Sequence, residues 1–210
     1  MKNIETREIK IFSPYYTEES AKHSVEYAKK IFGKGFKETG LEWISSAPVY
    51  IPFWIVQMEM TLRDPRKGLV TKVYRAMVNG ITGRGSMTAG TLSFQTVTAK
   101  GIIMDDDGHG QSKVNDEARL AVLGATQKLI NPPPCRMLPG TELVYYPMAL
   151  VHCKIKGKED FRMFDYVRGG LDKWFLNYLR YKEIADAKKG VKPNPNPIPD
   201  IHAAIPAYLR

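Results

Sequence analysis

The chain has 210 residues, of which 43% are hydrophobic and 25% are charged, and this balance excludes a wholly disordered protein. Its formal net charge of +9 favours anionic partners, but it does not choose among nucleic acid, acidic protein surfaces and phosphorylated ligands. The first residues lack the apolar run of a signal peptide, and the longest apolar stretch, residues 47–56, is about half as long as a membrane span. We therefore expect a cytoplasmic protein without a membrane span, or one that a partner carries elsewhere.

The first predicted element is a helix over residues 18–32. Thr17 can cap its first turn, which is acidic and suits the helix dipole, and Gly33 can end it. Apolar residues recur along this segment at helical spacing and form one buried stripe: Ala21, Val25, Ala28, Ile31 and Phe32.

A β-hairpin is predicted next, between residues 49 and 83. Its first strand follows Pro52, and alternate residues share one face: Trp54, Val56, Met58 and Met60. The polar segment 63–68 is rich in turn residues and joins this strand to a second one. The second strand is expected to end at the glycines and the asparagine of residues 79–85, which tolerate a positive φ.

Seven residues of this hairpin are arranged as in a known module: Tyr50, Pro52, Trp54, Asn79, Gly80, Thr82 and Gly83. They resemble a small module of PepSY-like and related zinc-ribbon-associated proteins, in which one strand begins Tyr-x-Pro-x-Trp and the next ends in Asn-Gly-x-Thr-Gly. The zinc-ligand cysteines found beside some such modules are absent from this sequence. The resemblance implies a regulatory or interaction unit with a binding role and no chemistry of its own.

The acidic segment 105–116 fits the spacing of a twelve-residue calcium loop. Asp105, Asp107 and His109 fall at positions 1, 3 and 5, and Asp116 falls at position 12. These four residues are therefore a candidate Ca²⁺ site. Against it, His109 is a poor ligand for a hard cation, and the residues before the loop are typical of a strand. A solvated acidic turn is the interpretation that we favour.

A second helix is predicted over residues 116–130, with Asn115 as its cap, and a second hairpin over residues 144–173. The two hairpins align, because Tyr50 matches Tyr145 and Pro52 matches Pro147 along the first strands. Gly80 stands opposite Gly170 in the same alignment. The polar turn of the second hairpin is expected at residues 156–160.

These patterns predict an internally duplicated α+β fold. Each repeat is a helix followed by a β-hairpin, and the two repeats share an antiparallel sheet, because one hairpin alone cannot bury both helix and sheet. We expect a first repeat with an extra strand over residues 1–100, a second repeat with a C-terminal helix over residues 101–189, and an extended arm over residues 190–210.

The C-terminal region is predicted to bind a partner. An amphipathic helix over residues 170–188 is followed by an arm whose many prolines exclude helix and central strand. The arm nevertheless carries apolar residues that a free tail would not need. The candidate partner-binding residues are Trp174, Tyr178, Ile198, Ile201, Ile205, Tyr208 and Leu209.

Cys135 and Cys153 lie outside any CxxC pair, and we expect two structural thiols, with a disulfide between them left open. His152 precedes Cys153, but neighbouring residues of a strand point to opposite faces and do not form a nucleophilic pair.

Together these features favour a non-catalytic accessory subunit of a multi-subunit complex. It would bind other protein subunits, or a copy of itself, through its sheet and its C-terminal arm. Two alternatives stay open. The first is an enzyme, or a protein that binds a small ligand or a metal ion, with a site between the repeats. The second is a basic protein that binds nucleic acid.

Overall fold

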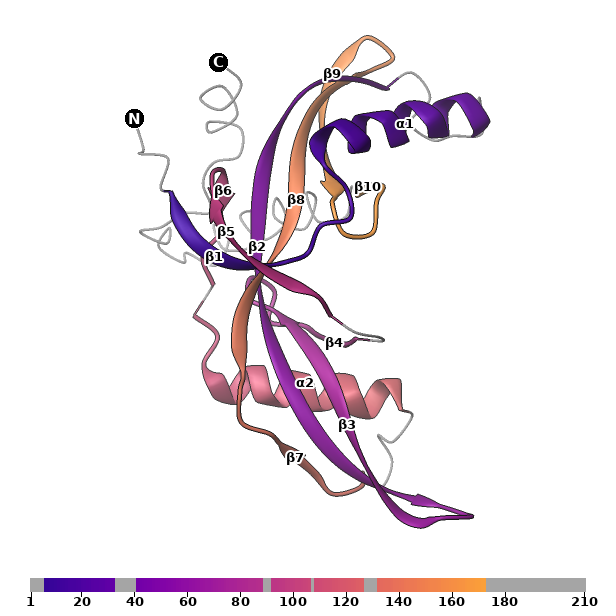
Figure 1. Cartoon of the computed structure of the whole chain (residues 1–210), viewed down its shortest axis with the longest axis vertical. Coiled ribbons are helices and arrows are strands. Elements are labelled where there is room, and N and C mark those ends of the chain that lie inside the picture. The colour runs from indigo at the N-terminus through magenta and orange to yellow at the C-terminus, as the bar shows by residue number, and fades with distance from the viewer. Residues whose placement is uncertain (1–5, 33–40, 89–91, 107, 127–131, 173–210) are drawn as a thin grey trace, which may run out of the picture. The chain divides into compact units, whose positions relative to one another are not determined.

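The computed structural model describes residues 6–32, 41–88, 92–106, 108–126 and 132–172. The chain divides into two compact units (Figure 1). Unit 1 comprises Met1–Tyr50, Gln95–Met104 and Pro147–Arg210, and unit 2 comprises Ile51–Phe94 and Asp105–Tyr146. Two long strands, β2 (Leu41–Asp64) and β8 (Glu142–Ile155), contribute residues to both units.

Unit 1 is built on the antiparallel hairpin of β8 and β9 (Lys158–Asp165). Met148 pairs with Asp165 at one end and Ile155 with Lys158 at the other. The hairpin closes through Lys156 and Gly157, which both have positive φ. The remaining elements of this unit are β1 (Arg7–Phe12), α1 (Glu18–Phe32), β5 (Phe94–Ala99), β6 (Ile102–Ile103) and β10 (Leu171–Asp172).

The core of unit 1 lies between α1 and the β8–β9 hairpin. Ala21 and Val25 of the helix pack against apolar residues of the strands, and the cluster contains Leu41, Ala149, Val151, Cys153 and Phe164. Three aromatic rings surround Phe164 in edge-to-face geometry at centroid distances of 5.7 to 5.9 Å: Tyr16, Trp43 and Tyr166. The first helix, α1, therefore packs against the β8–β9 hairpin, which lies far from it along the chain.

Unit 2 is built on the hairpin of β2 and β3 (Gly68–Asn79), which is paired from Phe53 and Asn79 to Asp64 and Gly68. The turn forms because Asp64 Oδ1 accepts hydrogen bonds from the backbone N–H groups of Arg66 and Lys67, at 2.8 and 3.0 Å, and because Gly68 adopts a φ of 76°. The remaining elements are β4 (Gly85–Met87), α2 (Gln111–Ala125) and β7 (Cys135–Met137).

The core of unit 2 lies between α2 and one face of the β2–β3 hairpin. The alternation of apolar and polar residues predicted for β2 is confirmed, because Val56, Met58 and Met60 are buried on this face. They pack with Ala76 and Val78 of β3 and with apolar residues of the helix, Val114, Ala118, Val122 and Leu123.

The strands β3 and β9 end in turns with the same hydrogen bonds. Asn79 Oδ1 accepts from the second and third backbone N–H groups after it, both at 2.9 Å, and Asp165 Oδ1 does the same at 2.8 Å. Gly83 N–H returns to Asn79 O, and Gly169 N–H returns to Asp165 O. Gly83 therefore corresponds to Gly169, and the expected match of Gly80 with Gly170 is wrong.

The expected α+β class is also wrong. Most of the described residues are strands in a large mixed sheet, with the order β10-β9-β8-β2-β3-β4, and they contain two helices, neither long and apolar enough to cross a membrane. The sheet is mixed because β6 pairs with β2 in parallel. The expected helix–hairpin units do not form. The first helix, α1, packs against the second hairpin, β8–β9, and the second helix, α2, packs against the first hairpin, β2–β3. Local patterning marks an apolar stripe without specifying which apolar surface will cover it.

The predicted boundaries of the three helices can be compared with the structure. The helix predicted over residues 18–32 is confirmed. The helix predicted to start after Asn115 begins instead at Gln111, whose Nε2 donates to Asn115 Oδ1 at 2.7 Å, so that Asn115 does not act as its cap. The predicted C-terminal helix does not begin at Gly170, because Leu171 and Asp172 pair with β9.

Candidate partner-binding site

The partner-binding residues predicted from the sequence lie outside the described residues. They are Trp174, Tyr178, Ile198, Ile201, Ile205, Tyr208 and Leu209. A candidate site in the described part of the chain must therefore be built from other residues.

Of the residues predicted to bind Ca²⁺, the structure describes Asp105, His109 and Asp116, and it does not bring these three into one group. Asp105 is exposed in the loop before α2, Asp116 is exposed on the helix, and Asp107 lies outside the described residues. His109 Nδ1 is 3.3 Å from Lys113 Nζ, and its Nε2 is 3.3 Å from the carbonyl oxygen of Ile81. Because an ammonium group can only donate, Nδ1 accepts and the Nε2–H group donates. Within the described ranges, no group of three or more His, Cys, Asp or Glu side chains could hold a metal ion.

The acidic run is held by a hydrogen bond to Trp54 that the sequence did not indicate. Trp54 Nε1 donates to Asp106 Oδ2 at 3.2 Å. A Cβ atom on Gly80 would lie 2.9 Å from Asp106 Oδ1, so this carboxylate fits closely against the turn after β3. Trp54 and Asp106 are 52 residues apart, and no local pattern could have joined them.

The two cysteines, both of which the structure describes, form no disulfide bond. Cys153 is buried in unit 1, with its Sγ 3.4 Å from the carbonyl oxygen of Asp160, whereas His152 stacks on Phe161. Burial raises the pKa of Cys135 above its ordinary value, and the charge of Arg119 offsets only part of this increase. The Cys135 thiol therefore lacks the depressed pKa of a reactive cysteine.

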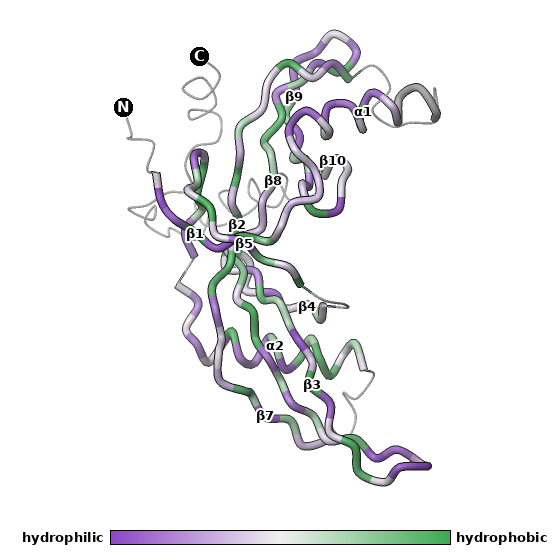
Figure 2. The backbone as a smooth tube through the Cα atoms, in the orientation of Figure 1, coloured by the Kyte–Doolittle hydropathy of each residue, from purple (hydrophilic) through white to green (hydrophobic). Residues whose placement is uncertain are grey.

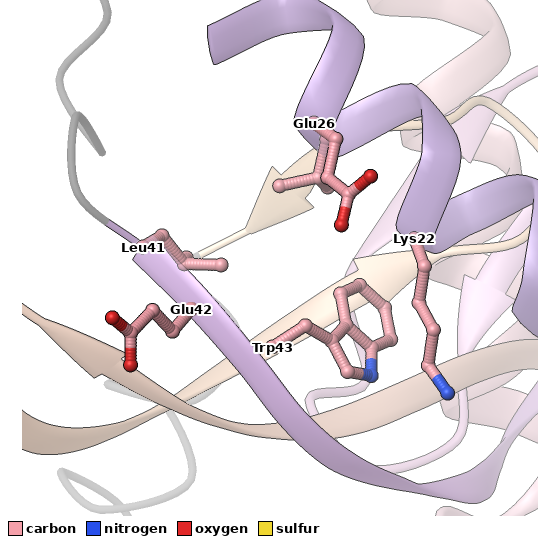
Figure 3. Close-up of a pocket in the computed structure, with 6 residues that line it drawn as sticks. Lys22, Glu26, Leu41, Glu42 and Trp43 are labelled. Atoms are coloured by element: carbon pink, nitrogen blue, oxygen red, sulfur yellow. The ribbon is translucent and has the colours of Figure 1, made fainter.

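A small pocket lies between α1 and β2 in unit 1 (Figure 3). Lys22 and Glu26 line it from the helix, and Leu41, Glu42 and Trp43 line it from the strand. Its volume of about 200 Å³ is below the range of about 300–1,000 Å³ that is usual for small-molecule sites. We therefore assign it no ligand.

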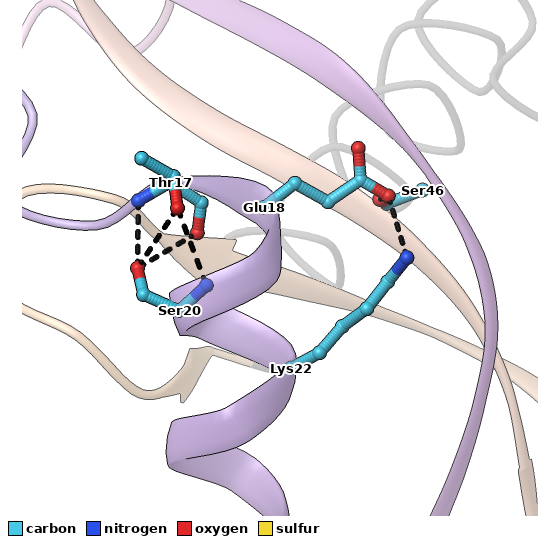
Figure 4. Close-up of polar contacts among 5 residues, drawn as sticks. All are labelled: Thr17, Glu18, Ser20, Lys22 and Ser46. Carbon is cyan, nitrogen blue, oxygen red and sulfur yellow. Dashed lines mark hydrogen bonds and ion pairs between the residues drawn. The ribbon is translucent and has the colours of Figure 1, made fainter.

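The polar groups beside this pocket hold the start of α1 in place (Figure 4). Thr17 Oγ1 accepts from the backbone N–H of Ser20 at 3.2 Å, which confirms the predicted cap. Glu18 forms an ion pair with Lys22 at 2.9 Å and accepts a hydrogen bond from Ser46 at 2.7 Å. Burial raises the pKa of Glu18, but these two partners outweigh it and bring the pKa below its ordinary value.

The outer edge of β3 is an open hydrogen-bonding surface in the described part of unit 2. β4 pairs with β3 only at residues 76–78, and Thr88 N–H adds one bond to the carbonyl oxygen of Arg75. In an antiparallel strand the backbone groups of alternate residues point to the same edge, so those of Leu69, Thr71 and Val73 point outward as those of Arg75 do. These groups have no strand partner among the residues that the structure describes.

The same residues expose apolar side chains. Leu69 is 77% exposed and Val73 is 55% exposed, on the face of β3 opposite the α2 core. Figure 2 shows that the backbone next to the hydrophilic turn between β2 and β3 is coloured hydrophobic. We call residues 69–75 the open edge.

Comparisons with protein-family models, with curated proteins and with solved structures found no match to this chain. The function must therefore be argued from the open edge itself.

Proposed function

We propose that the protein is a non-catalytic accessory subunit that binds an extended segment of a partner protein by adding it as a strand to the open edge of β3. The observation that carries this proposal is the row of outward backbone groups on Leu69, Thr71 and Val73, beside two exposed apolar side chains. An added strand would satisfy the backbone groups, and its side chains would cover the apolar ones.

The exposed edge supports a binding role because native sheets usually protect such edges. Short edge strands, covering loops or prolines are the common protections, and residues 69–75 contain no proline and no bulge in their pairing with β2. Lys72 is a charged residue of the kind that protects an edge, whereas the apolar Leu69 and Val73 give no such protection.

The polar groups elsewhere in unit 2 support a non-catalytic reading. His109 bridges Ile81 and Lys113, and Trp54 holds Asp106. The contacts of His109 connect the turn after β3 to the start of α2, and the contact of Trp54 connects β2 to the segment before α2. Their role is to hold the fold together.

Thr71→Pro tests the proposal directly. The N–H of Thr71 points outward, so proline removes a donor from the open edge and leaves the bonds between β2 and β3 in place. Thr71→Ala is the matched control, because it removes only the hydroxyl that lies 3.3 Å from Thr61 Oγ1. Complexes isolated from the native host would be measured by native mass spectrometry. We expect a partner subunit with the wild type and with Thr71→Ala, and about tenfold less with Thr71→Pro.

Circular dichroism would establish that Thr71→Pro retains its sheet. If the variant unfolds, Val73→Lys serves in its place, because it puts a charge on the exposed face without altering the backbone. A partner that associates equally with the wild type and with a folded edge variant would overturn the proposal.

A further inference from the structure

The open edge is surrounded by positive charge. Five basic residues are exposed on the turn and on the strands beside it: Arg63, Arg66, Lys67, Lys72 and Arg75. None of them forms an ion pair with another described residue. The one acidic residue of the segment, Asp64, is engaged by the backbone of the turn. The charge is therefore available to a partner.

The charges have a fixed order relative to the apolar side chains. Arg63 pairs across the hairpin with Leu69, so both lie on the face opposite the α2 core. Arg75 follows Val73 at a spacing of two and lies on that face as well. Lys72 lies on the other face of the same edge. A strand added here would therefore meet Leu69 and Val73 between two arginines on the face opposite α2. On the α2 face it would meet Lys72.

We infer that the segment added to the open edge is an acidic extended peptide, which carries Asp or Glu residues together with β-branched or other apolar residues. This inference rests on the proposed function and names the chemistry of the partner. Glutamate or aspartate opposite Lys72 would form a cross-strand pair. An acidic residue just beyond the position opposite Val73 would be attracted to Arg75, whose own opposite position is taken by Thr88. Lysine at either place would be repelled. Valine or isoleucine opposite Leu69 and Val73 would cover the exposed apolar surface.

A second copy of the chain fits this edge poorly. If two open edges paired in antiparallel fashion about Thr71, Val73 of one copy would face Leu69 of the other, which is favourable. The same register would bring Arg75 of each copy toward Lys67 of the other, at both ends of the pair. Like charges brought close together destabilise a strand pair, so the charges select an acidic segment over self-association.

Fluorescence anisotropy with the full chain tests the inference. The probe is a short fluorescein-labelled peptide of valine, threonine and glutamate, and its counterpart has lysine in place of glutamate. We expect the acidic peptide to bind at least about tenfold more tightly, and its affinity to fall as salt screens the charges. The double variant Lys72→Glu with Arg75→Glu should reverse the preference. Lys100→Glu with Lys158→Glu makes the same change in net charge at two exposed residues of unit 1, and it should keep the preference.

The outcomes separate the two proposals. If both peptides bind equally and Thr71→Pro weakens both, strand addition stands and the acidic partner is overturned. If Thr71→Pro changes neither, strand addition fails as well. A single-stranded oligonucleotide that displaces the acidic peptide and binds more tightly would also overturn the inference, in favour of nucleic acid as the anionic partner.

Discussion

The indole N–H of Trp54 donates a hydrogen bond to Asp106 Oδ2 at 3.2 Å, and it joins the first strand of the β2–β3 hairpin to the segment that leads into α2. Asp106 Oδ1 is buried and has no hydrogen-bond partner among the described residues. The indole is therefore the one described side chain that supports this carboxylate.

Replacing Trp54 with Phe should destabilise the protein by about 1–3 kcal/mol, because it leaves a buried carboxylate without its donor. Chemical denaturation followed by circular dichroism measures the change. Phe also fills less space than Trp, so the comparison needs Asp106→Ala and the double variant. A coupling energy near zero between the two substitutions would contradict the role of the hydrogen bond.

Two glycines of unit 2 should respond to alanine in opposite directions. A Cβ atom on Gly85 would clash with the carbonyl oxygen of Glu117, which is backbone of α2, so we expect Gly85→Ala to destabilise by about 1–3 kcal/mol. Gly124 lies in α2 with nothing within 4 Å of its added Cβ, so Gly124→Ala should stabilise by about 0.5–1 kcal/mol. Thermal unfolding of the two variants side by side checks both signs.

The turn after β3 should depend on an acceptor at position 79 and not on its charge. Asn79→Ala removes the acceptor of two backbone N–H groups and should cost about 1–2 kcal/mol. Asn79→Asp should be close to neutral, because Asp165 accepts the equivalent pair of bonds after β9. Denaturant midpoints distinguish these results, and equal losses in both variants would argue against the shared turn.

Tyr166 should make the stability of the protein fall at high pH. Burial, with smaller contributions from the charges of Glu18 and Tyr50, raises its pKa to about 12. The folded state then holds the phenolic proton more tightly than the unfolded state, whose tyrosine titrates near 10. This contribution is complete below pH 10 and is lost as the pH rises toward 12. Ultraviolet titration would detect the late ionisation, and Tyr166→Phe should remove that part of the pH dependence of unfolding.

Local features of the fold were predictable where neighbouring residues determine them. Thr17 and the acidic first turn located α1, and the polar segment 63–68 contains the turn between β2 and β3. The alternation of Val56, Met58 and Met60 gave the buried face of β2 correctly. In each case the pattern that predicts the feature lies within a few residues along the chain.

The rest depended on contacts between distant segments. Nothing near Ala21 indicates that it will be buried by Ala149 and Val151, and nothing near Val114 indicates β2 and β3. The open edge was missed for the same reason. Residues 69–75 read as an ordinary strand, and only the short reach of β4 leaves their outer backbone groups without a strand partner in the described structure.

The crossed packing of the helices also sets an order of assembly. Unit 2 draws its residues from the middle of the chain, whereas unit 1 joins the first fifty residues to segments that follow residue 146. On the ribosome, α1 emerges long before the β8–β9 hairpin that buries its apolar stripe. The middle of the protein can therefore fold while synthesis continues, and the N-terminal helix must wait, with its apolar side exposed, for nearly the last described strand to be made.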